Sequence, residues 1–94
     1  MVRFTRKKDS EIRKIYNNDE FCGVIGTVKD LTQTGIVEIE GNADPNAWLV
    51  VFSDASRARV MNEWDSLENA KLYVKSYFNT HDDVTSALRY VFKR

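Results

Sequence analysis

The feature that most limits the fold is a continuous apolar run at residues 47–52, AWLVVF. An uninterrupted apolar run of this length is typical of a strand that is covered on both faces, or at least central in its sheet. The turn signal GNADPN at residues 41–46 precedes it, and SDAS at residues 53–56 follows it. The run therefore predicts a buried strand, around which the other elements build a core.

Three further segments have strand character. Residues 21–30 and 36–40 are rich in β-branched residues, and LTQTG between them supplies a glycine for a hairpin loop. Apolar and acidic residues alternate within residues 36–40, which indicates one buried and one wet face. Residues 57–64 fit either a strand or a helix. The strand is favoured because VVFSDASRARV has the form of a hairpin.

Helical spacing of apolar residues predicts three helices. Residues 9–17 carry an apolar stripe of Ile12, Ile15 and Tyr16, a possible cap at their start, and Asn17-Asn18 as a possible end. Residues 66–78 follow Asp65, which with an acidic residue three positions later resembles a capping box. Residues 81–92, preceded by Thr80 as a cap, show the clearest helical stripe in the chain.

The order of these elements predicts a single α+β domain over residues 1–94. We expect a short N-terminal helix, a three- or four-stranded mainly antiparallel sheet, and two C-terminal helices packed on one face. Residues 1–8 precede the first helix and are expected to form a mobile basic arm.

The residue totals argue against several classes of protein. A single cysteine cannot form an internal disulfide, so a secreted disulfide scaffold is not indicated. No apolar run approaches the roughly 20 residues that a membrane-spanning helix needs. We therefore expect a cytoplasmic protein that does not enter a membrane.

Residues that could carry catalysis or bind a metal are few. Cys22 lies in an apolar segment, where a thiol behaves as a small buried hydrophobic group. His81 stands beside Asp82 and Asp83, whose side chains would point in different directions from a helix. The chain has no Cys-x-x-Cys, His-x-x-x-His, EF-hand or G-x-S-x-G pattern. The sequence thus predicts no enzyme activity, no metal and no cofactor.

Charge is unevenly distributed, although the net charge is zero. Residues 1–14 carry six bases and two acids, whereas residues 15–56 carry one base and seven acids. The pI of about 6.6 lies below the range, above ~9, that is usual for duplex DNA binders. Local basic clusters beside aromatic residues still suit phosphate contact and base stacking. The candidate basic binding residues are Arg3, Arg6, Lys7, Lys8, Arg57, Arg59, Arg89, Lys93 and Arg94.

A second candidate surface is acidic or aromatic. Glu38 and Glu40 share one face of the expected strand at residues 36–40, and Asp44 follows in the turn. Solvated strand faces are commonly acidic, so these residues equally fit an ordinary wet surface. Trp64 ends the ambiguous strand; tryptophan is enriched at binding hot spots, although in so small a chain it is more often a core residue.

In size, charge balance and lack of a catalytic set, the chain is similar to small regulatory or inhibitor proteins. The sequence favours a non-enzymatic interaction protein that binds a protein or ribonucleoprotein target and modulates or inhibits it by occlusion. The alternative is an RNA-binding or single-stranded nucleic-acid-binding protein, which requires the N-terminal and C-terminal basic clusters to converge. A homodimer through an open sheet edge or the C-terminal helices is a further option.

Overall fold

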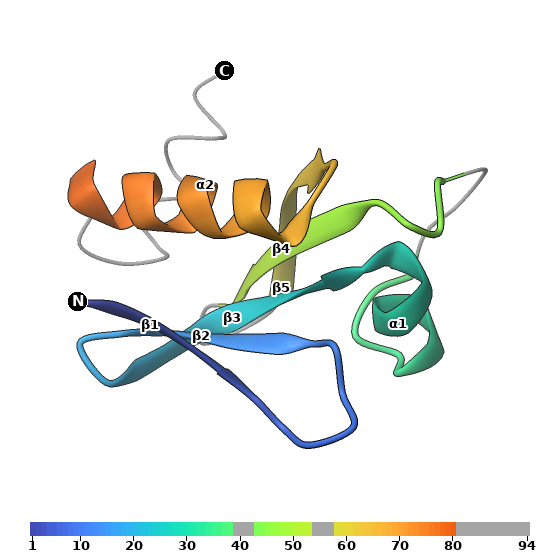
Figure 1. Ribbon diagram of the computed structural model, residues 1–94, viewed down its shortest axis with the longest axis horizontal. Coiled ribbons are helices and arrows are strands. Elements are labelled where there is room, and N and C mark those ends of the chain that lie inside the picture. Colours follow the sequence, from blue (N-terminus) through green and yellow to red (C-terminus); the bar gives the residue numbers. More distant parts are fainter. Residues whose placement is uncertain (39–42, 54–57, 81–94) are drawn as a thin grey trace.

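A computed structural model describes residues 1–38, 43–53 and 58–80 of the chain, with the backbone alone for residues 58–62 and 80. Within these residues the fold is α+β, with one five-stranded antiparallel sheet and two helices (Figure 1). The strands lie side by side in chain order. The elements are β1 Val2–Arg6, β2 Arg13–Asn17, β3 Glu20–Thr27, α1 Val28–Gln33, β4 Trp48–Ser53, β5 Ala58–Trp64 and α2 Leu67–Thr80.

The predicted α+β class is confirmed, and so is the apolar run as a covered strand. β4 lies between β3 and β5, and its residues from Leu49 to Phe52 are all buried. The described part of the ambiguous segment at residues 57–64 is a strand, β5 at Ala58–Trp64, which pairs with β4 as the hairpin form indicated. The helix predicted at residues 66–78 is also present, as α2.

The N-terminal helix and the mobile arm predicted for the chain are wrong. β1 pairs antiparallel with β2, so residues 2–6 belong to the sheet and no helix covers residues 9–17. The spacing of the apolar residues in residues 9–17 fits a helix and a strand alike. Ile15 is fully buried as a strand residue, while Tyr16 points to the opposite face. A nine-residue helix would be marginal by itself, whereas two paired strands extend an existing sheet.

A tight turn between β2 and β3 fixes this arrangement. Asn18 and Asp19 both have positive φ angles, 53° and 67°, as a two-residue type I′ hairpin requires. Asn17 and Glu20 form the closing pair of the ladder. The Asn-Asn pair that suggested the end of a helix is therefore part of a hairpin turn, since Asn and Asp tolerate left-handed backbone conformations.

The predicted hairpin between residues 21–30 and 36–40 is also wrong, because a short helix follows β3. The hydroxyl of Thr27 accepts a hydrogen bond from the backbone N–H of Asp30 at 3.1 Å and so caps α1. The chain leaves α1 through Gly35, with a φ angle of 77°. The described residues after it, up to Glu38, form no strand.

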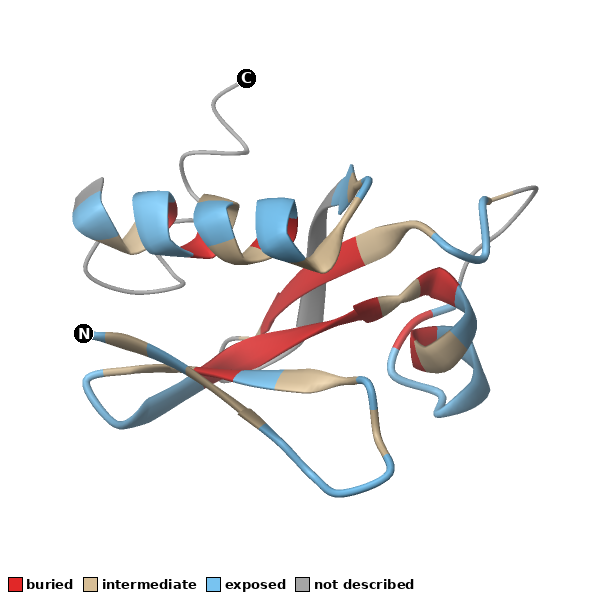
Figure 2. Ribbon diagram, viewed as in Figure 1, coloured by how far each residue is buried: buried red, intermediate tan, exposed pale blue. Residues whose placement is uncertain are grey.

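Two hydrophobic clusters lie on the two faces of the sheet. On the first face, α2 packs over β3 and β4 with its sheet-facing side buried and its outer side exposed (Figure 2). This first-face cluster consists of Ile15, Cys22, Ile25, Val50, Phe52, Ala70, Val74 and Tyr77. On the second face, α1 covers one end of the sheet. The second-face cluster consists of Val24, Val28, Leu31, Val37, Leu49 and Val51.

α2 begins at Leu67, one residue later than predicted, and its cap is Ser66. The hydroxyl of Ser66, not the carboxylate of Asp65, accepts a hydrogen bond from the backbone N–H of Asn69 at 3.2 Å. The side of α2 that faces the sheet carries Ala70, Val74 and Tyr77. The second C-terminal helix, predicted at residues 81–92, lies outside the described residues.

Candidate functional site

The second face of the sheet carries a cross-strand row of one arginine and two aromatic side chains. Arg3 of β1 is opposite Tyr16 of β2, which is opposite Phe21 of β3. The Arg3 guanidinium carbon lies 4.7 Å from the centre of the Tyr16 ring, a cation–π contact. The rings of Tyr16 and Phe21 meet edge to face, with centroids 5.8 Å apart and planes at 70°. We call this the Arg3–Tyr16–Phe21 row.

The row is accessible to solvent. Phe21 is 49% exposed, and the Arg3 side chain is 53% exposed. α1 lies at the end of β3 remote from the β2–β3 turn (Figure 1), so it does not cover Phe21. Aromatic residues and arginine are enriched at protein binding interfaces relative to the rest of the surface.

A bulge in β3 places Phe21 on this face. Ile15 pairs with Gly23 and Tyr16 pairs with Phe21, so Cys22 is an extra residue on β3. The extra residue shifts the alternation of side chains. Cys22 and Ile25 both join the first-face cluster, although strict alternation would put them on opposite faces.

Gly23 makes the bulge sterically feasible. Its φ angle is 151°, which side chains rarely adopt, and a Cβ atom there would lie 2.0 Å from the backbone oxygen of Val51. Glycine is therefore required where β3 crosses close to β4. The position of Phe21 in the row therefore depends on Gly23, which is not itself part of the row.

Charged groups flank the row. Lys14, two residues before Tyr16 on β2, is exposed on the same face and makes no ion pair within the described residues. Arg3 pairs with Asp19 at 3.3 Å, and Asp19 is 91% exposed. Such exposed pairs contribute about 0–1 kcal/mol. The ion pair between Arg3 and Asp19 is therefore weak, and another anion can replace Asp19.

Two lysines that were not singled out from the sequence border β1 on the first face. The ammonium groups of Lys71 and Lys75 lie 5.6 and 6.0 Å from the centre of the Phe4 ring. The two lysines stand four residues apart on α2 and therefore share one side of that helix. This four-residue spacing was the signal in the sequence that the two lysines lie together. Only the packing of α2 beside β1 brings the two lysines next to the basic residues of that strand.

The other predicted basic residues have varied positions. Arg6 ends β1 and pairs with Glu11 at 3.3 Å. Lys7 and Lys8 are exposed in the β1–β2 loop. Arg59 belongs to β5, where only the backbone is described. The remaining predicted basic residues, which lie outside the described residues, are Arg57, Arg89, Lys93 and Arg94.

The predicted acidic and aromatic residues do not gather in the described part of the chain. Glu38 is exposed and lies in no strand, and Glu40 lies outside the described residues. The carboxylate of Asp44 accepts a hydrogen bond from the backbone N–H of Asn46 at 2.9 Å and so shapes a local turn. Trp64 packs against Tyr73, with ring centroids 4.9 Å apart, at the border of the first-face cluster.

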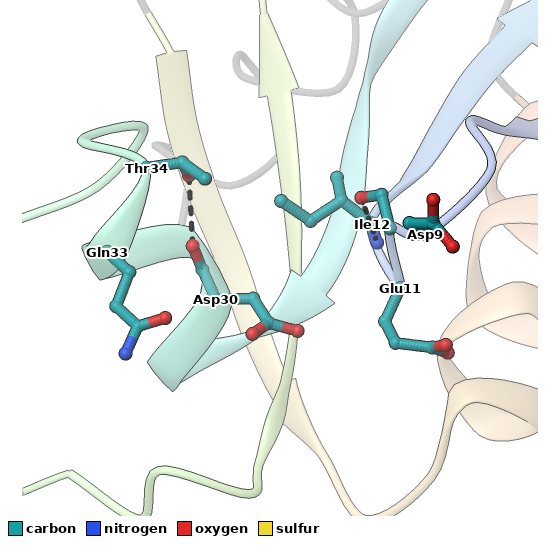
Figure 3. A pocket seen from close by; sticks show the side chains of 7 residues that line it. Asp9, Glu11, Ile12, Asp30, Gln33 and Thr34 are labelled. Carbon is teal, nitrogen blue, oxygen red and sulfur yellow. Dashed lines mark hydrogen bonds between the residues drawn. The ribbon is translucent and has the colours of Figure 1, made fainter.

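A hollow of about 250 Å³ lies between α1 and the β1–β2 loop (Figure 3). Its polar groups serve local structure: Thr34 donates to the Asp30 backbone oxygen at 2.9 Å, and the Ser10 hydroxyl accepts from the Ile12 N–H at 3.2 Å. Glu11 accepts ion pairs from both Arg6 and Arg13. The hollow is lined by Asp9, Ser10, Glu11, Ile12, Asp30, Gln33 and Thr34.

The described residues do not assemble a nucleophile with a base. Cys22 is buried, and its thiol donates to the Glu20 backbone oxygen at 3.3 Å. His81 lies outside the described residues. Within the described part of the chain, no group of three or more His, Cys, Asp or Glu side chains is placed to hold a metal ion.

Comparison with protein-family models, with curated proteins and with solved structures found no match to this chain. Among the described helices, none is long and apolar enough to cross a membrane.

Proposed function

We propose that this protein is a non-enzymatic binding protein that holds its target against the Arg3–Tyr16–Phe21 row and acts on the target by occlusion. The observation that carries this proposal is the exposure of Phe21, at 49%, within a row of side chains that contact one another. Tyrosine and arginine are among the residues that most often dominate binding energy.

The row is also pre-organised for binding. Its three side chains stand on three neighbouring strands, and each contacts the next, so little freedom remains to be lost when a target binds. The fold itself gains little from Phe21, since a half-exposed ring removes much less apolar surface from water than a buried one. A binding role accounts for an aromatic side chain left at that position.

A position-specific cross-linking experiment tests the proposal. Phe21 is replaced by a photoreactive phenylalanine analogue, and the protein is irradiated in a cell extract. Leu72 serves as the matched control position because it is a large apolar residue, 60% exposed, on α2 and away from the row. We expect a discrete cross-linked adduct from position 21 and none from position 72.

Digestion of the adduct with nuclease or protease then assigns the class of target. An adduct of equal yield from both positions, or from position 72 alone, would mean that the target binds elsewhere and would refute the proposed surface. Circular dichroism of both substituted proteins checks that each keeps the fold.

A further inference from the structure

Resting on the proposed function, we infer that the target is a single-stranded nucleic acid, with bases stacked on the Arg3–Tyr16–Phe21 row and phosphates against Arg3 and Lys14. Proteins that bind single strands combine aromatic stacking surfaces with cations that follow the backbone. The second face of the sheet brings both kinds of group together near the β2–β3 turn.

The aromatic half of this chemistry lies across three strands. Phe21 offers an exposed ring, and Arg3 presents a half-exposed guanidinium plane over Tyr16. Bases stack on aromatic rings and on guanidinium planes alike. Because every base has a flat π-face, such a surface accepts a single strand with little dependence on sequence.

The cationic half lies beside the row and along β1. Lys14 has no ion pair within the described residues, and the exposed Asp19 partner of Arg3 is readily exchanged for a phosphate. Lys71 and Lys75 add positive charge on the other side of β1, above Phe4. A strand of phosphates that crosses the β1 edge would thus meet cations on both sides of the sheet.

The same features argue against a duplex and against an acidic peptide. Bases in a duplex are already stacked and cannot reach the row without being extruded. The zero net charge and the acids Asp19 and Glu20 at the turn also limit how many phosphates this surface can neutralise. An acidic peptide would satisfy the cations, but its carboxylates would not stack on the exposed ring of Phe21.

Fluorescence anisotropy with labelled oligonucleotides tests the inference on the full chain. The probes are an oligothymidylate, an oligouridylate and a DNA duplex of the same length, each at low and at physiological salt. We expect binding of one or both single strands in preference to the duplex, weakened by salt. The two single strands separate DNA from RNA, and either result supports the inference.

Matched variants locate the binding. Phe21→Ala should weaken single-strand binding about tenfold or more, as expected for the loss of one stacked base. Lys14→Gln should reduce the slope of log affinity against log salt by about 0.7, the value for one phosphate contact on a single strand. Leu72→Ala and Lys29→Gln, exposed controls on α2 and α1, should leave affinity and slope unchanged.

The outcomes separate this inference from the proposed function. Absence of oligonucleotide binding, duplex binding as strong as single-strand binding, or binding that ignores Phe21→Ala would each overturn the inference. If position 21 nevertheless cross-links to a protein, the proposed binding surface stands and only the nucleic-acid target is wrong. If position 21 gives no adduct and no oligonucleotide binds, both fail. Urea unfolding of each variant confirms that a loss of binding is not a loss of fold.

Discussion

The two faces of the sheet use the same kind of side chain in opposite ways. On the first face, Phe52 is completely buried, with the rings of Tyr77 and Phe78 at centroid distances of 5.3 and 5.6 Å. On the second face, Phe21 contacts Tyr16 at a similar distance, 5.8 Å, but remains half exposed. The difference is the covering layer, since α2 lies over the first cluster whereas α1 reaches only the far end of the second face.

This contrast shows that the covering helix, and not the aromatic side chains themselves, decides whether an aromatic cluster is buried in the core or exposed. Burying a large apolar side chain contributes roughly 1.5–3 kcal/mol, and a half-exposed one contributes correspondingly less. The first-face cluster therefore holds the fold together. The row on the second face contributes little to folding and stays accessible to a target.

The largest effect should come from Phe52→Ala, which we expect to lower the free energy of unfolding by about 3–5 kcal/mol because it leaves a cavity in the first-face cluster. Phe21→Ala is its counterpart on the second face and should cost less than about 1 kcal/mol. Urea unfolding followed by circular dichroism measures both. Equal losses would contradict the contrast between the stabilising first-face cluster and the exposed Arg3–Tyr16–Phe21 row.

The next largest loss of stability should come from Gly23→Ala, because Gly23 permits the bulge that sets which side chains of β3 lie on each face. The added Cβ meets the Val51 backbone oxygen at an impossible 2.0 Å, so we expect a loss of about 2–4 kcal/mol from overpacking and backbone strain. Gly35→Ala is the control, because its φ angle is also positive but a Cβ there meets nothing within 4 Å. It should cost about 1 kcal/mol. Thermal unfolding that ranks Gly35→Ala as the more damaging change would rule out the steric role of Gly23.

A smaller effect concerns the helix that covers the first face. Ser66→Ala removes the cap of α2 and should cost about 1 kcal/mol. Asp65→Ala should cost less, because Ser66, and not Asp65, accepts the hydrogen bond that the Asn69 N–H donates. Chemical denaturation of the two variants in parallel checks the order. A larger loss of stability from Asp65→Ala than from Ser66→Ala would mean that Asp65 is the cap, as the sequence suggested.

The smallest effect on stability should come from Asp19→Asn, which breaks the exposed pair with Arg3 while keeping a residue that tolerates the positive φ angle of the turn. We expect a change within about 0.5 kcal/mol in urea unfolding. Oligonucleotide affinity should rise, because Arg3 is released and a negative charge is removed beside the row. Weaker binding by this variant would argue against phosphate contact at Arg3.

Only part of the candidate site could be predicted. Arg3 was named from its basic surroundings, but Tyr16 was assigned to a helical core stripe and Phe21 to an ordinary strand. The row exists because the extra residue Cys22 shifts the side-chain alternation of β3, and this bulge depends on the register in which β3 pairs with β2 rather than on local residue preference. Lys71 and Lys75 join the basic edge only through the packing of α2.

The sequence by itself determined the elements whose signals are local and agree with one another. The apolar run at residues 47–52 specified the covered strand, and the capping pattern before residues 66–78 specified α2 to within one residue of its start. Tertiary structure decided residues 9–17, where the apolar spacing fits a helix and a strand alike. A short segment has too little intrinsic preference to choose, and the neighbouring strands settle it by pairing with its backbone and burying Ile15.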